Sequence, residues 1–140
     1  MLYPPEPLPK YPHLKPSEAE LMTEYILLYG KEYKGFEYDV LVGTPPEPPP
    51  GIGKEFIRDW EYLASLKIDA VGHKEEEIHI IELKETARPQ DIMQLATYLV
   101  LYKDKYKPTK RIRGILATRF ARPDARMLAD EFMIEIRLVP

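Results

Sequence analysis

The nine residues IHIIELKET, 78–86, combine the apolar pattern of a core strand with an acid and a base on one face. Side chains alternate between the two faces of a strand, so Glu82 and Lys84 point the same way. Ile81 and Leu83 point to the other face, which is apolar enough to be buried. The stretch therefore predicts a buried strand that presents a carboxylate beside an ammonium group.

A second strand precedes this one, and a short polar turn joins the two. SLKIDAVG, 65–72, is followed by HKEEE and then by EIHIIELK, 77–84, which is the pattern of a hairpin. If the turn is centred near residues 75–76, Asp69 lies opposite Glu82 on the same face. Two carboxylates and one ammonium group would then converge.

The rest of the chain predicts helices around a mixed sheet. A helix is expected from Ser17, with Ser17 as N-cap and Glu20 closing a capping box, and the alternation in 36–42 indicates a strand. A βαβ crossover should run from Glu82 through a helix at 89–104 to a strand at 112–120. The other expected elements are a helix at 53–64, a helix at about 123–131 and a strand at 134–139. The expected fold class is α/β, with an αβββαβ core and a C-terminal αβ unit.

Two neighbouring carboxylates repel each other unless a positive charge lies between them. Oxygen ligands of this kind suit Mg²⁺ or Mn²⁺, with water and phosphate oxygens in the other positions. A lysine beside such an ion can position a water molecule and offset charge on phosphorus, which is the chemistry of metal-assisted phosphodiester hydrolysis. Taken alone, Glu82 and Lys84 are more simply a salt pair on a solvated face, and EYK at 32–34 has the same spacing with no aspartate-bearing hairpin before it.

The order of these motifs resembles the PD-(D/E)XK nuclease superfamily. The first half-motif reads Ile68-Asp69 and the second reads Glu82-Leu83-Lys84. On the next helix, QLATY at 94–98 is similar to the Q-x-x-x-Y motif of RecB-type nuclease domains, and the wider string is similar to small RecB-like nucleases encoded by phages. The resemblance covers roughly residues 17–140 and implies a restriction-endonuclease-like fold.

The resemblance also implies a role for each matching residue. Asp69 and Glu82 would bind the metal, with the backbone carbonyl of Leu83 as a third ligand, and Lys84 would activate or position the attacking water. Gln94 would orient the lysine or the scissile phosphate, and Tyr98 would support it. An acid of the first helix, Glu20 or Glu24, would complete the metal shell.

The charge distribution predicts a nucleic-acid partner on one side of the molecule. Residues 1–100 carry ten basic residues (Lys and Arg) and eighteen acidic residues (Asp and Glu). Residues 101–140 carry ten basic and five acidic residues. Flexible positive charge interleaved with tyrosine suits phosphate contacts and base stacking. No base-reading motif is present, so DNA binding should depend weakly on sequence. The expected contacts are Lys103, Lys105, Lys107, Lys110, Arg111, Arg113, Arg119 and Arg122.

Composition excludes several other chemistries. The chain of 140 residues has no cysteine, which removes disulfides, thiolate metal sites and cysteine nucleophiles. No apolar run is long enough for a membrane span, and the proline-rich start lacks the pattern of a signal peptide, so a cytoplasmic location, that of the host if phage-encoded, is expected. We expect a proline-rich tail at 1–16 and one domain at 17–140. Many charges, much proline and few thermolabile residues indicate a hot-living source.

The sequence thus predicts a Mg²⁺- or Mn²⁺-dependent deoxyribonuclease, phage-associated and active in DNA processing, recombination or repair. A Holliday-junction resolvase is the alternative within the nucleases. A non-catalytic DNA-binding or phage-structural protein on a nuclease fold is the alternative from another class. A homo-oligomer is left open.

Overall fold

The computed structural model describes all 140 residues, and its centre is a five-stranded mixed sheet in the order β1-β2-β3-β4-β5. The strands are β1 (Gly35–Val42), β2 (Leu66–His73), β3 (Glu77–Ala87), β4 (Arg111–Ala121) and β5 (Glu135–Leu138). β1, β2 and β3 pair antiparallel, whereas β4 pairs parallel with both β3 and β5. This confirms the expected mixed sheet, including the crossover from β3 to β4.

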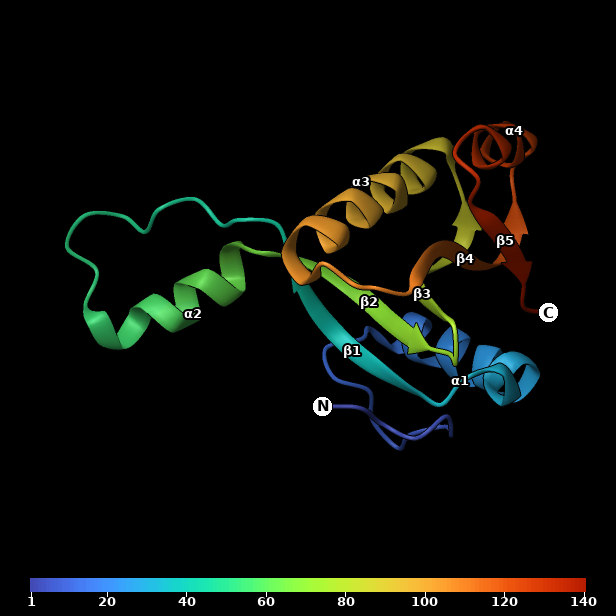
Figure 1. Ribbon diagram of the computed structural model, residues 1–140, viewed down its shortest axis with the longest axis horizontal. Coiled ribbons are helices and arrows are strands. Elements are labelled where there is room, and N and C mark those ends of the chain that lie inside the picture. The colour runs from blue at the N-terminus through green and yellow to red at the C-terminus, as the bar shows by residue number, and fades with distance from the viewer.

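Helices cover both faces of this sheet (Figure 1). The helices are α1 (Pro16–Tyr29), α2 (Lys54–Ala64), α3 (Pro89–Tyr106) and α4 (Pro123–Glu131), with a 3₁₀ turn at Gly30–Glu32. One core cluster joins α1 to one face of the sheet, and a second joins α3 and α4 to the other. Ile115, Leu116 and Ala117 of β4 are fully buried because that strand is covered on both sides.

α1 begins two residues earlier than the sequence pattern predicts. Lys15 is the N-cap and Pro16 is the first helical residue. Proline suits this position because its fixed φ is already helical, and because an N–H there would have no partner within the helix. The N3 residue is therefore Glu18, whose Oε1 accepts the backbone N–H of Lys15 at 2.9 Å. The prediction that Ser17 and Glu20 form the capping box was wrong, and Glu20 is free of that role.

β1 does not keep one face throughout, as simple alternation would require. Phe36 and Tyr38 pack on the α1 side, whereas Val40 and Val42 pack on the α3 side. Between them Asp39 has a left-handed backbone, with φ of +57°. That single residue turns the strand over, and its carboxylate accepts a hydrogen bond from the Tyr62 hydroxyl at 2.5 Å.

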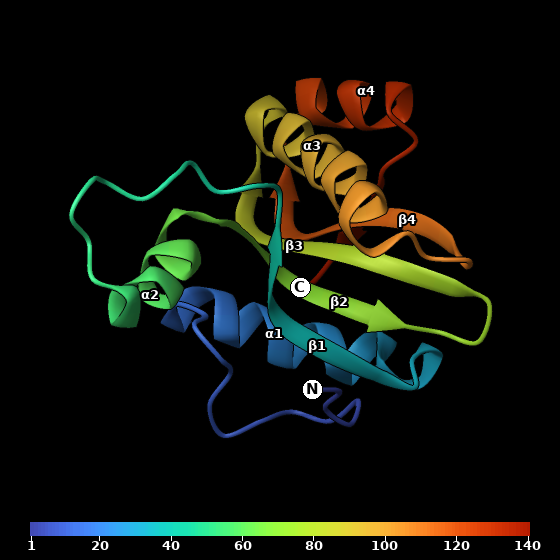
Figure 2. The ribbon, with the colours of Figure 1, turned by 60° about the vertical axis from the view of Figure 1, so that its left-hand side comes forward.

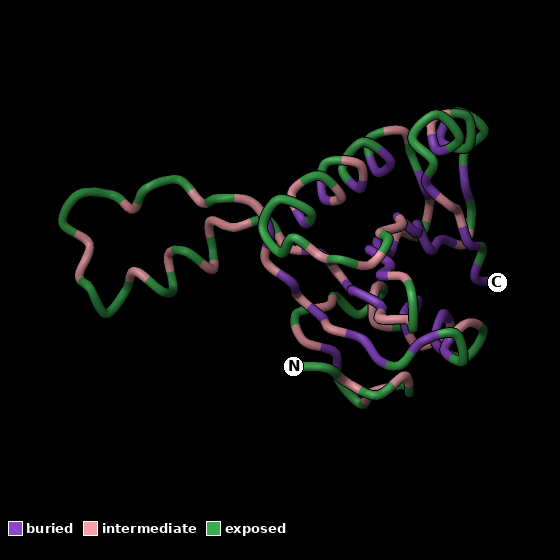
Figure 3. The backbone as a smooth tube through the Cα atoms, viewed as in Figure 1, coloured by how far each residue is buried: buried purple, intermediate pink, exposed green.

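The segment between β1 and β2 projects from the body as an arm, defined here as residues 43–65 (Figure 1). It contains the proline-rich loop and α2, in which no residue is buried. The exposure of the arm contrasts with the buried strands beside it (Figure 3). The N-terminal tail, in contrast, lies against the edge of β1, where Tyr3 pairs with Phe36. No helix combines the length and apolar character needed to cross a membrane.

Candidate active site

The β2–β3 hairpin brings Asp69 and Glu82 together as its register requires. Ala70 pairs with Ile81, so the next two positions outward from the turn are Asp69 and Glu82. Each carboxylate accepts a hydrogen bond from the backbone of the other strand. The Asp69 N–H donates to Glu82 Oε1 at 3.3 Å, and the Leu83 N–H donates to Asp69 Oδ2 at 3.0 Å. The convergence of the two carboxylates is therefore a property of the structure.

Burial makes this carboxylate pair electrostatically unfavourable when both groups are charged. Desolvation is the main cause that raises the pKa of Asp69 to about 6, and the neighbouring charge of Glu18 adds to it. The pKa of Glu82 lies well above its ordinary value, first because of burial and second because of the charge on Asp69. A cation bound between the two carboxylates would therefore offset their repulsion.

Lys84 follows Glu82 on the same strand and lies at the edge of a small polar cavity. Its Nζ is 4.0 Å from Oδ1 of Asp91, and about a third of its side chain is exposed. The cavity has a volume of about 280 Å³ and is lined by Lys84, Glu85, Thr86, Arg88 and Asp91, without any hydrophobic residue. The lysine thus reaches solvent beside the carboxylate pair and is not locked in a buried salt bridge.

Gln94 and Tyr98 lie on one face of α3, as their spacing predicts. The Gln94 Nε2 donates to the Tyr98 hydroxyl at 2.9 Å. Burial raises the pKa of Tyr98 to about 12, and the charges of Glu82 and Asp69 contribute to that rise, which places this hydroxyl near the carboxylate pair. The five residues of the predicted catalytic set are therefore brought together from β2, β3 and α3.

The first helix presents a different acid from the two that the sequence suggested. Glu20 and Glu24 both form ion pairs with Arg119, at 3.7 and 2.5 Å. Glu18, two residues before Glu20, is the α1 acid whose charge raises the pKa of Asp69.

The predicted DNA-contacting residues do not gather in one place, because Arg119 and Arg122 lie at the Lys84 end of the sheet and others lie far from it. Arg111 and Arg113 pair with Glu77 and His79 at the start of β3, whereas Lys84 pairs with Thr118. Seven strand residues at about 3.3 Å each put roughly 23 Å between the two ends. Three of the arginines are also neutralised: Arg113 by Glu135 and Glu77, Arg119 by Glu20, Glu24 and Glu85, and Arg122 by Asp124.

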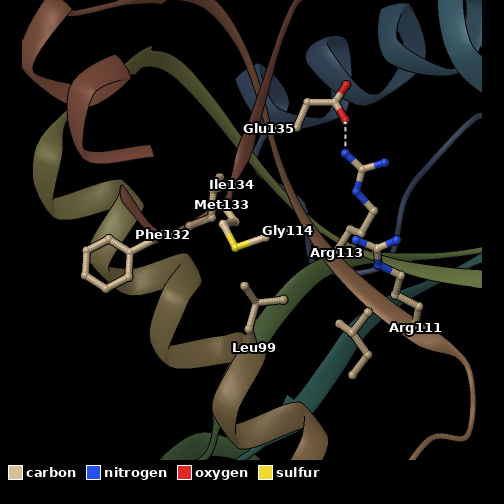
Figure 4. Close-up of a pocket in the computed structure, with 9 residues that line it drawn as sticks. Leu99, Arg111, Arg113, Gly114, Phe132, Met133, Ile134 and Glu135 are labelled. Carbon is tan, nitrogen blue, oxygen red and sulfur yellow. Dashed lines mark hydrogen bonds and ion pairs between the residues drawn. The ribbon is translucent and has the colours of Figure 1, made fainter. Parts of the chain in front are cut away.

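The most voluminous surface groove lies away from the carboxylate pair, between the end of α3, the start of β4 and β5 (Figure 4). It has a volume of about 470 Å³, and Leu99, Phe132, Met133 and Ile134 are among its lining residues. The ion pair of Arg113 with Glu135, at 3.0 Å, lies at its edge. No acid, base and nucleophile converge there, so the groove is not a candidate for catalysis.

Three residues near the carboxylate pair were missed by the sequence reasoning: Glu18, Arg88 and Asp91. Two local signals in the sequence indicate the two acids of this set, Glu18 and Asp91. Pro16 and Pro89 each stand at the first position of a helix, and the acids at the third position, Glu18 and Asp91, then follow from capping. No group of three or more His, Asp or Glu side chains is arranged as a complete metal shell.

The sheet order and the helices on both faces define a restriction-endonuclease-like fold. Residues 52–140 match the family model described as the Endonuclease NucS C-terminal domain. Because this match spans more than half of the chain, the protein belongs to that family. No curated protein matches the chain.

Solved structures agree with this fold. The chain is similar to an EndoMS chain in a complex with double-stranded DNA, with a TM-score of 0.53, 20% identity and coverage of 95% of this chain and 50% of that one. It is similar to a repair endonuclease from Pyrococcus abyssi, with a TM-score of 0.53, 19% identity and coverage of 95% and 50%. This chain therefore spans about half the length of these related chains.

Proposed function

We propose that this protein is a divalent-metal-dependent DNA nuclease that hydrolyses phosphodiester bonds. The observation that carries the proposal is the carboxylate pair of half-buried Asp69 and buried Glu82, with Lys84 two residues further along β3. Membership of a family named for an endonuclease supports the same activity, and the similarity to an EndoMS–DNA structure supports DNA as the partner.

The donor set fits a hard divalent cation. Asp69 and Glu82 offer carboxylate oxygens that form no ion pair, and burial raises the pKa of both groups although the charge of Lys84 lowers it. The N–H and C=O of one strand residue point to the same side of the strand, so the Leu83 carbonyl lies on the side of Asp69, to which its N–H donates. Mg²⁺ is commonly held by one or two carboxylates together with waters and phosphate oxygens. Glu18, whose charge acts on Asp69, would be the α1 acid of the shell, because Glu20 and Glu24 pair with Arg119.

When bound, Mg²⁺ or Mn²⁺ would polarise the scissile phosphate and lower the pKa of a coordinated water. The residues of the chain supply the rest. The Lys84 ammonium holds the attacking water or a phosphate oxygen beside Glu82, and Tyr98 accepts a hydrogen bond from Gln94, which fixes the amide of Gln94 on the face of α3 that faces the carboxylate pair.

The test is cleavage of labelled linear, circular, branched and single-stranded DNA in the presence of Mg²⁺ or Mn²⁺. We expect Lys84→Ala to lose cleavage by two orders of magnitude or more while retaining DNA binding, as removal of a positioned catalytic group typically costs about 10²–10⁴-fold. Equal cleavage by wild type and variant would refute the role of Lys84. Preference for the branched substrate would favour the Holliday-junction resolvase.

Metal binding distinguishes the proposed nuclease from the alternative of another class, a DNA-binding protein without catalysis. Calorimetry with Mn²⁺ should show binding by wild type and none by Asp69→Ala. If both bind equally weakly, the enzyme proposal fails. The phage-encoded origin and the hot-living source rest on the sequence and stay predictions. A role in repair has the support of one similar structure, described as a repair endonuclease.

A further inference from the structure

A row of polar side chains continues from the carboxylate pair to the start of α3. Lys84, Thr86 and Arg88 all line the polar cavity beside the carboxylate pair. Arg88 has an extended backbone, with φ of −120° and ψ of 162°, just before Pro89 begins α3. At about 3.3 Å per residue, the backbone positions of Lys84 and Arg88 are at most about 13 Å apart.

The cavity described above lies along this row, and its acids are already engaged. Oδ2 of Asp91 accepts the backbone N–H of Arg88 at 2.9 Å, and Oε2 of Glu85 accepts from Arg119 at 3.1 Å. Lys84 lies 4.0 Å from Asp91, and neither the Thr86 hydroxyl nor the Arg88 guanidinium has a hydrogen-bond or ion-pair partner. The groups left to bind a ligand are thus a hydroxyl and two cations.

Arg88 is unusual among the arginines of this end of the sheet. Arg119 and Arg122, which the sequence predicts as DNA contacts, both form ion pairs with carboxylates. Arg88 carries no such pair and is exposed. Its guanidinium can accept a phosphate without first breaking an intramolecular salt bridge, and a guanidinium matches the geometry of phosphate oxygens.

We propose that Thr86 and Arg88, beside Lys84 on the same cavity, form a phosphate subsite for the DNA strand that is cleaved. Arg88 and Thr86 bind a backbone phosphate next to the scissile one, so that the strand runs along the row from Glu82 toward α3. This deepens the proposed function and rests on it. The side chains provide the site, because the backbone N–H of Arg88 is already taken by Asp91. Contacts of this kind position DNA without reading its sequence.

The experiment measures DNA affinity separately from cleavage. Binding of fluorescently labelled DNA is followed by anisotropy at several salt concentrations, without divalent metal, for wild type, Arg88→Ala, Arg88→Lys and Thr86→Val. Arg126→Ala is the matched control, since Arg126 is also an exposed arginine without an ion pair and lies on α4, outside the proposed subsite. Cleavage by wild type in Mg²⁺ is measured in parallel.

We expect Arg88→Ala to weaken binding about 5- to 10-fold and to lower the slope of log K against log salt by about 1, as loss of one phosphate contact requires. Thr86→Val should weaken binding about 2-fold, Arg88→Lys should recover part of the loss, and Arg126→Ala should change affinity less than about 2-fold. An unchanged affinity for Arg88→Ala, or equal losses for Arg88→Ala and Arg126→Ala, would overturn the subsite. Absence of cleavage by wild type would instead count against the nuclease proposal.

Discussion

At the scale of single residues, the carboxylate pair opposes folding when no cation is present. Glu82 is buried and Asp69 is half-buried, and desolvation raises the pKa of both. A carboxyl group with a raised pKa in the folded state stabilises that state fully below its ordinary pKa, and this contribution is lost as pH rises through the folded value. For Asp69 the loss extends from about pH 4 to above pH 6.

Asp69→Asn should therefore stabilise the metal-free protein while abolishing metal binding. Removing the charge and keeping the shape should raise the free energy of unfolding at pH 7.5 by about 1 to 3 kcal/mol, and the gain should shrink toward pH 4. Urea unfolding of both proteins in EDTA across this pH range measures the difference. A variant less stable than wild type at pH 7.5 would show that the pair is not strained.

Asp91 contributes at the same scale by capping α3. Its carboxylate accepts the N–H of Arg88, which would otherwise be unpaired at the start of the helix. Asp91→Ala should cost about 1 kcal/mol, whereas Asp91→Asn keeps an acceptor oxygen and should cost less. Thermal unfolding compares the two variants, and equal losses would indicate that charge and not capping is the stabilising property.

At the scale of elements, the arm of residues 43–65 is bound to the body by few contacts. The α2 helix has 11 residues and no buried side chain, and a helix of this length is marginal in water without packing. The Tyr62 hydroxyl bond to Asp39 is one contact that ties it to β1. The arm lies beside the ends of β1 and β2, in the part of the sheet that carries Asp69 (Figure 2).

Hydrogen exchange should separate α2 from the rest of the molecule. Amides of residues 54–64 should exchange at least about 100-fold faster than the central amides of α3, because local opening of α2 exposes no core. Tyr62→Phe should speed exchange in α2 further and leave that in α3 unchanged. Protection of α2 equal to that of α3 would mean that the helix is covered in solution.

At the scale of the whole molecule, a buried polar network joins α1, β3 and β5. The Tyr33 hydroxyl lies 2.7 Å from His79 Nδ1 and 2.5 Å from the Tyr25 hydroxyl, and Arg137 donates to Tyr25 at 3.0 Å. His79 Nε2 lies 3.0 Å from Glu77. Neutral His79 satisfies both neighbours when Nε2–H donates to Glu77 and Nδ1 accepts from Tyr33.

This network should make the fold sensitive to acid. Burial lowers the pKa of His79 below its ordinary value of 6.5. A group with a lowered pKa contributes its stability fully above the ordinary pKa and loses it as pH falls toward the folded value, because the unfolded chain binds the proton first. Wild type should therefore lose stability relative to His79→Gln below about pH 6.5. Parallel curves for the two proteins from pH 5 to 8 would contradict this.

The sequence by itself determined the local elements and which residues share a strand face or a helix face. The repeat of two along 77–84 placed Glu82 and Lys84 together, the hairpin count placed Asp69 opposite Glu82, and the spacing in 94–98 placed Gln94 beside Tyr98. These relations are local or follow from one short turn, so backbone geometry alone sets them.

Only the tertiary structure decided which charges are free and which acid approaches the pair. The sequence predicts Arg119 as a DNA contact, but Arg119 pairs with carboxylates of α1 and β3. Glu20 and Glu24 pair with Arg119, whereas the charge of Glu18 acts on Asp69. The turn-over of β1 at Asp39 and the distance of the basic stretch from Lys84 also needed three dimensions. Ion pairs between distant segments depend on how helices are rotated against the sheet, and packing of the core fixes that rotation.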